Sequence, residues 1–116
     1  VAQLYDSFHP AVLAAMQHVV EAAHAENCPV SVCGEMAGNP SGAILLMAMG
    51  YDMLSMNATN LPRVKSVIRS VDMAFAKSVL AEVMTLDSPM VVSSTVQLAL
   101  NKQGQGHILG PGGGKR

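Results

Sequence analysis

Residues 30–38, with the sequence VSVCGEMAG, constrain the fold of this chain more than any other stretch. Val30 to Cys33 is too short and too β-branched for a helix and stops at Gly34, so it is predicted to be a short buried strand. Cys33 stands at the carboxyl end of this strand, and a loop that contains Glu35 and a second glycine follows. This loop is the candidate functional site, because it presents a thiol and a carboxylate just before an apolar helix begins.

A second strand is predicted at Met53 to Met56, and the apolar helix lies between the two strands. The helix covers residues 41–49, with Asn39 or Ser41 available as its cap and Gly50 as its terminator. Two short apolar strands joined through a helix are typical of a parallel βαβ unit, whose sheet is buried on both faces. Because the helix is apolar nearly all round, it must be covered on more than one side.

The rest of the chain is predicted to be mainly helical. The first helical segment covers residues 10–25, and the second opens at Leu61-Pro62. A third segment is capped by Asp72 and broken by Ser88-Pro89. For residues 90–102 the pattern is also compatible with a strand, but a helix is favoured. Residues 104–116 form a Gly-rich segment that is expected to be a flexible tail after a domain portion over residues 1–103. The GPGGG run in this tail lacks the flanking strand and helix of a phosphate loop.

The composition excludes two classes of partner. Of the 116 residues, half are hydrophobic, 3% are aromatic and 13% are charged, and the formal net charge is −1. A chain with no basic excess and almost no aromatic side chains is not expected to bind nucleic acid. The longest apolar run, Ala43 to Met49, is far too short to cross a membrane. The small charged fraction also predicts that part of the surface is covered by other copies or by the rest of a larger protein.

The cysteines and histidines do not indicate a structural metal or disulfide. Cys28 and Cys33 lie five positions apart across a strand start, which is poor geometry for a disulfide and offers too few ligands for zinc. His18 and His24 fall on the wet face of their helix and are expected to be solvated. Free thiols, and a first segment without the basic residues of a signal peptide, favour a cytoplasmic location.

Three segments together resemble a known family: NCPVSVCGEMAG at residues 27–38, GYDMLSMN at residues 50–57 and PRVK at residues 62–65. They are similar to the C-terminal end of the phosphoenolpyruvate-utilising enzymes. Within these enzymes they most resemble the phosphoenolpyruvate-protein phosphotransferases, which are enzyme I of the bacterial phosphotransferase systems. The nitrogen-related branch of enzyme I is the most similar. The resemblance covers residues 4–110. It implies an α/β fold, namely the last part of a (β/α)8 TIM barrel, in which the two predicted strands are the seventh and eighth.

The resemblance also implies a reaction and roles for two residues. In this family the phosphoryl group of phosphoenolpyruvate moves to a histidine of the enzyme and then to a histidine-containing phosphocarrier protein. Cys33 matches the proton donor that converts the remaining enolate to pyruvate, and burial beside Glu35 or in an apolar loop would keep its thiol protonated. Gly34, with Gly38, would let the backbone approach the substrate closely.

Other parts that the family requires are not recognised in this sequence. The motifs for the phosphorylated histidine, the phosphate-binding arginines and the Mg²⁺ carboxylates are absent, so the isolated chain is expected to be inactive.

Two alternatives remain open at this point. The parent protein could be a pyruvate phosphate dikinase or a phosphoenolpyruvate synthase, which share the cysteine motif, or the segment could act mainly as an interaction module in a homodimer.

Overall fold

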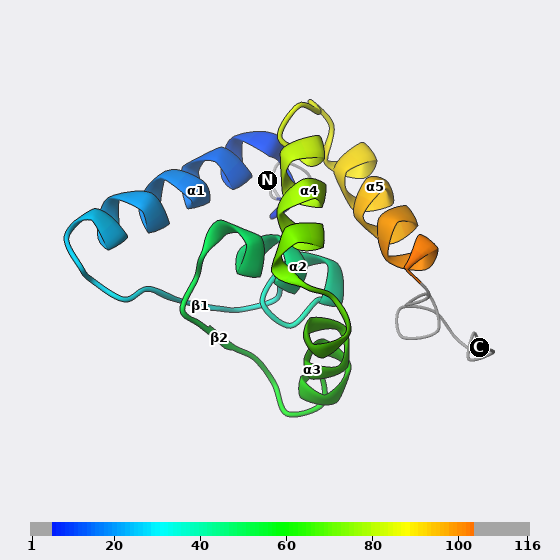
Figure 1. Cartoon of the computed structure of the whole chain (residues 1–116), viewed down its shortest axis with the longest axis horizontal. Helices are drawn as coiled ribbons and strands as arrows, with labels where there is room; N and C mark the ends of the chain where they lie inside the picture. Colours follow the sequence, from blue (N-terminus) through cyan, green and yellow to red (C-terminus); the bar gives the residue numbers. More distant parts are fainter. Residues whose placement is uncertain (1–5, 104–116) are drawn as a thin grey trace.

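The computed structural model describes residues 6–103, and Figure 1 shows that helices make up most of this part of the chain. The elements in chain order are α1 (Pro10–Ala25), β1 (Ser31–Cys33), α2 (Pro40–Met49), β2 (Met53–Ser55), α3 (Leu61–Ser70), α4 (Met73–Val83) and α5 (Pro89–Lys102). The predicted Gly-rich tail, residues 104–116, lies outside the described residues.

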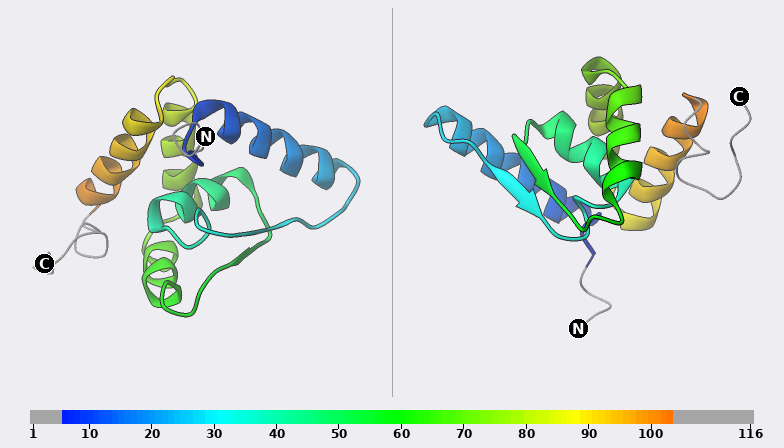
Figure 2. Two further views of the ribbon diagram at one scale, coloured as in Figure 1. Left: turned by 180° about the vertical axis from the view of Figure 1, so that it is seen from behind. Right: turned by 90° about the horizontal axis from the view of Figure 1, so that it is seen from below.

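The βαβ unit predicted from the sequence is confirmed. Strands β1 and β2 pair in parallel, with α2 between them in the chain, and Figure 2 shows the two strands side by side with α2 next to them. The register aligns Ser31 with Met53, and Cys33 with Ser55 at the carboxyl ends of both strands. Each strand is one residue shorter than predicted, since Val30 and Met56 lie just outside the ladder.

Local signals at both ends of α2 fix its position. The Asn39 side chain accepts hydrogen bonds from the backbone N–H groups of Ser41 and Gly42, so Asn39 is the N-cap, one of the two caps predicted. The helix already begins at Pro40, because proline suits the first helical position, where no N–H is needed. Gly50 ends the helix in the left-handed conformation, with φ of 106°.

Helix α2 is the centre of the hydrophobic core. Nine of its ten residues are buried, and α3, α4 and α5 all pack against it. The prediction that this helix must be covered on several sides is therefore confirmed. Its burial explains how a chain with few aromatic residues builds a core, since Ile44, Leu45 and Leu46 are completely buried among aliphatic side chains.

The prediction that both strands are buried is wrong for the described part of the chain. One face of the two-stranded sheet consists of the exposed residues Ser31, Cys33, Met53 and Ser55. On the other face, Val32 and Leu54 are half-buried against the core. Within residues 6–103, the helices cover only the face that carries Val32 and Leu54. No other element of this part of the chain covers the face that carries Cys33 and Ser55.

The remaining helices follow the predicted segments closely. Helix α1 has the predicted bounds, and α5 confirms that the ambiguous segment is helical rather than extended. Asp72 caps α4 by accepting a hydrogen bond from the Phe75 N–H, as predicted. This helix stops at Val83, earlier than expected, so Leu86 packs against the core from the loop between α4 and α5.

Candidate functional site

A pocket of about 370 Å³ lies at the carboxyl ends of the two strands. Its lining consists of Cys33, Gly34, Glu35, Ser55, Met56, Asn57 and Asn60. The first three come from the end of β1 and its loop, and the others come from the end of β2 and the loop before α3. Ligand sites of parallel α/β proteins are built at this end of the strands, so the pocket is the candidate site.

The structure brings Cys33 and Gly34 together in this pocket, where the sequence analysis predicted a site. Cys33 is the last residue of β1, and its thiol is free and exposed. The expected burial of Cys33 is therefore not found among the described residues, because it projects from the uncovered face of the sheet. An exposed thiol can exchange its proton with solvent.

Gly34 occupies a backbone conformation that needs glycine. Its φ of 107° is rarely adopted by residues with a side chain. A Cβ added to Gly34 would meet no atom within 4 Å, so open space lies in front of this part of the backbone. Both observations agree with a loop whose backbone is accessible to a ligand.

Gly38 has a different function from the one expected. It is buried, and a Cβ added to it would lie 2.9 Å from Asn60 Nδ2 and 3.4 Å from the Met56 Cβ. The absence of a side chain therefore lets the loop after β1 pack against the loop after β2, and it does not open space for a ligand. The Gly38 N–H also donates to the Gly34 carbonyl oxygen at 3.3 Å, which closes the loop on itself.

Four residues of the pocket were not identified from the sequence: Ser55, Met56, Asn57 and Asn60. The second strand was recognised, but nothing in its own pattern marks these side chains as part of a site. The parallel pairing supplies the missing signal, because it places the end of β2 beside the end of β1. Glu35 lies between this pocket and a neighbouring one of about 200 Å³ that Asp6 and Phe8 also line.

A second polar cluster lies at the opposite end of the strands. The Asp52 Oδ2 accepts hydrogen bonds from His24 Nε2 and from the Val30 backbone N–H, both at 2.8 Å. The Asp52 N–H in turn donates to the Val30 carbonyl oxygen at 2.9 Å. The hydrogen bond from His24, followed by the one from Val30, holds the pKa of the Asp52 carboxyl below its usual value. This cluster joins α1 to the starts of both strands.

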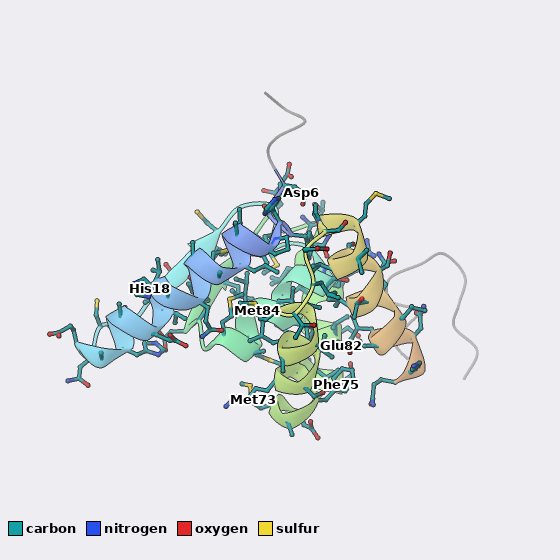
Figure 3. All side chains as sticks on the ribbon, turned by 90° about the horizontal axis from the view of Figure 1, so that it is seen from above. Asp6, His18, Met73, Phe75, Glu82 and Met84 are labelled. Atoms are coloured by element: carbon teal, nitrogen blue, oxygen red, sulfur yellow. The ribbon has the colours of Figure 1, made fainter. Side chains whose placement is uncertain are left out.

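The other histidine and cysteine candidates remain apart from the pocket. His18 lies on the exposed side of α1, as predicted (Figure 3). Cys28 is exposed in the loop before β1 and is not paired with Cys33. Within residues 6–103, no three His, Cys, Asp or Glu side chains are grouped so that they could hold a metal ion. No helix in that part is long and apolar enough to span a membrane.

Comparison with protein families gives a match that covers both strands. Residues 1–73 match the family described as PEP-utilising enzyme, PEP-binding domain. The matched range includes both strands, α1, α2 and α3, and hence all residues that line the pocket. The family match and the pocket therefore fall on the same part of the chain.

Several characterised proteins are similar to this chain over a larger share of its length. A phosphoenolpyruvate-protein phosphotransferase of Haemophilus influenzae is 43% identical over 77 residues, which are 66% of this chain. A protein of the same name from Haloferax volcanii is 40% identical over 84% of the chain. The phosphoenolpyruvate-dependent phosphotransferase system protein of Escherichia coli is 32% identical over 94%. The chain spans only 13%, 17% and 15% of the lengths of these relatives.

Proposed function

The chain belongs to the phosphoenolpyruvate-utilising enzymes, as part of their C-terminal phosphoenolpyruvate-binding domain, and from this we propose that it completes the active site of a phosphoenolpyruvate-protein phosphotransferase. The main support is the position of Cys33 and Gly34, which lie together in a pocket at the carboxyl ends of parallel strands. In this proposal, β1 and β2 are the last two strands of a TIM barrel, and residues 1–103 are the C-terminal portion of that domain.

The proposed reaction needs a proton donor after phosphoryl transfer. When phosphoenolpyruvate loses its phosphoryl group to a histidine, the enolate of pyruvate remains. The Cys33 thiol then protonates the methylene carbon: a C–H bond forms, the S–H bond breaks, and the electron pair stays on sulfur. Thiols suit this role, because a pKa of about 8.5 in model peptides keeps them protonated at neutral pH. Solvent that enters the pocket then returns the proton to the sulfur.

Gly34 has the second role in this proposal. Its backbone faces open space beside the thiol, and no Cβ blocks the approach of a ligand. We infer that the three-carbon substrate lies against this glycine with its methylene carbon toward Cys33. A side chain at this position would fill the space and would strain the backbone as well.

The proposed cofactor is Mg²⁺, which neutralises negative charge on the phosphoryl group when it is bound. The described residues do not by themselves fit a magnesium site, because they contain no suitable cluster of carboxylates. We propose that the metal ligands, the phosphorylated histidine and the phosphate-binding arginines lie elsewhere in a longer enzyme. The 116-residue chain is then inactive, and phosphoryl transfer from phosphoenolpyruvate by this chain would contradict the proposal.

The role of Cys33 is tested by Cys33→Ala in the longer enzyme, with Cys28→Ala as the matched control. General acid catalysis contributes about 10²- to 10⁴-fold to a rate, so pyruvate formation should fall by at least about 100-fold. The binding of phosphoenolpyruvate should change little, because the thiol acts only on the enolate. Pyruvate formation at the normal rate in Cys33→Ala would exclude the proton-donor role.

The identity of the phosphoryl acceptor distinguishes the related enzymes. Transfer to a histidine-containing phosphocarrier protein is expected of a phosphotransferase, and the wording of the cysteine motif favours the nitrogen-related branch. ATP-linked turnover would instead indicate a pyruvate phosphate dikinase or a phosphoenolpyruvate synthase. The assay is therefore the transfer of label from phosphoenolpyruvate to a purified phosphocarrier, compared with transfer to AMP. A cytoplasmic location is part of this proposal.

A structural contribution to a homodimer is the second candidate function. Nine large apolar side chains are exposed in the described part of the chain, among them Met53, Met90 and Leu98. Surfaces of this kind suit an adaptable buried interface. Sedimentation of the chain at micromolar concentration tests this idea, and a folded monomer would contradict it.

A further inference from the structure

We propose that Ser55 is a positioning residue for Cys33, and that its hydroxyl group hydrogen-bonds the Cys33 sulfur while the thiol gives up and regains its proton. This inference rests on the proposed function for the identity of the proton acceptor. The contact itself is inferred from the pairing of the two strands.

The register of the sheet places Ser55 next to Cys33. The two residues are Cα partners in the parallel pair of β1 and β2. Neighbouring strands lie about 4.8 Å apart, and partner residues in a sheet project from the same face. Both residues are exposed on the uncovered face, and both line the pocket of about 370 Å³. The hydroxyl and the thiol therefore line the same pocket from neighbouring strands.

The Ser55 hydroxyl is available for this contact. Among the hydrogen bonds of residues 6–103, none uses Ser55 Oγ, whereas Ser70, Ser78 and Thr85 each bond a nearby backbone carbonyl. Ser55 Oγ is not bonded to Cys33 Sγ either, so the proposed bond is one that forms while the thiol reacts. A hydroxyl group can both donate and accept a hydrogen bond. Ser55 can thus accept from the thiol and donate to the thiolate by rotating its own hydrogen.

The contact would stabilise the sulfur at the moment of proton transfer. When the thiol protonates the enolate carbon, negative charge develops on sulfur. An O–H donor on the neighbouring strand stabilises that charge until solvent supplies a proton. The hydroxyl loses no proton and gains none, so Ser55 acts only through Cys33.

One other ionisable group shares the pocket with Cys33. Glu35 follows it by two residues on the loop after β1. From the β2 side, the lining residues besides Ser55 are Met56, Asn57 and Asn60, which carry no charge. Ser55 is the one residue of this lining that carries a hydroxyl group.

The experiment measures the reactivity of Cys33 toward iodoacetamide as a function of pH. The full 116-residue chain is used with Cys28→Ala, so that Cys33 is its single cysteine. We compare Ser55→Ala with Ser31→Ala, because Ser31 lies on the same face of β1 but pairs with Met53. Circular dichroism checks that each variant retains its helices.

Removal of the hydroxyl should move the reactivity profile to higher pH. One hydrogen bond contributes about two- to tenfold to the thiolate equilibrium, so Ser55→Ala should react two- to tenfold more slowly at neutral pH. Ser31→Ala should match the parent. An unchanged profile in Ser55→Ala, or an equal shift in Ser31→Ala, would overturn the inference.

A second pair of variants keeps the test valid if Ser55→Ala does not fold. Ser55→Thr and Ser55→Val have the same shape and differ in the hydroxyl group. The threonine variant should behave like the parent and the valine variant should show the shift, and equal profiles would refute the contact. These results do not depend on catalysis. A normal rate of pyruvate formation by Cys33→Ala in the longer enzyme would reject the proposed function while leaving the measured contact intact.

Discussion

His24 and Asp52, 28 positions apart in the sequence, are joined by a hydrogen bond of 2.8 Å at the end of the strands opposite Cys33. The same carboxylate oxygen accepts the Val30 N–H, so one side chain connects α1 with the starts of β1 and β2. The βαβ unit is thus held by charge-assisted hydrogen bonds at one end and carries its candidate site at the other. In (β/α)8 barrels, the end away from the active site serves stability.

The first prediction concerns acid pH. The pKa of Asp52 is lowered from 3.8, first by the His24 hydrogen bond and then by the Val30 hydrogen bond. A carboxyl group with a lowered pKa in the folded state contributes stability above its unfolded pKa, and this contribution is lost as the pH falls through the folded pKa. Asp52→Asn should therefore lower the urea midpoint at pH 7, and the difference from the parent should shrink as the pH falls below 3.8 and vanish once the lowered pKa of the carboxyl is passed.

The control for this prediction is Asp87→Asn. Asp87 is exposed and forms no hydrogen bond or ion pair among the described residues, so its removal changes the net charge by the same amount without breaking the cluster. If both variants show the same pH dependence, the effect comes from net charge and not from the contact with His24.

The second prediction concerns Gly42, in the first turn of α2. Alanine is normally better than glycine inside a helix by about 1 kcal/mol. A Cβ at Gly42, however, would overlap the Met36 carbonyl oxygen and lie 2.7 Å from the Met36 Cγ. Because Met36 is buried and the obstructing oxygen belongs to the backbone, Gly42→Ala should destabilise the chain by about 1–3 kcal/mol, as overpacking does. Equilibrium unfolding in urea measures this change, and a variant of raised stability would contradict the prediction.

Much of the fold could be predicted because its signals are local. Asn39 and Asp72 cap their helices with their own side chains, and Gly50 ends α2 within a single turn. The β-branched composition of β1 and the continuous apolar character of α2 likewise depend on neighbours in sequence. These features need no knowledge of the distant chain, so the sequence pattern was sufficient for them.

The features that could not be predicted join distant segments. His24 and Asp52 each occur in unremarkable surroundings, and only the parallel pairing brings them together. The same holds for Ser55, which becomes a neighbour of Cys33 through the register. The burial of the strands was predicted wrongly for a related reason. A short apolar strand indicates that other elements cover it. It does not indicate whether those elements lie within residues 6–103.

The last prediction concerns the contact between the two loops that form the pocket. In Gly38→Ala, the new Cβ would lie 2.9 Å from Asn60 Nδ2, so the asparagine side chain must move or the loops must separate. Because Nδ2 is the end of a half-buried side chain that can turn aside, we expect a loss of about 1 kcal/mol in the free energy of unfolding, the low end of the cost of overpacking. Truncation of the obstructing amide in the double variant Gly38→Ala with Asn60→Ala should recover part of this loss, so the two changes should not be additive.

Gly34→Ala is the matched control for this cycle. A Cβ at Gly34 has open space, but the backbone φ of 107° is unfavourable for alanine. Its cost, about 1–3 kcal/mol, comes from backbone strain and should not change when Asn60→Ala is added. A double-mutant cycle from urea unfolding separates the two mechanisms. If Asn60→Ala reduced the loss of stability equally in both glycine variants, or in neither, the cost of Gly38→Ala would not come from close packing of Gly38 against Asn60.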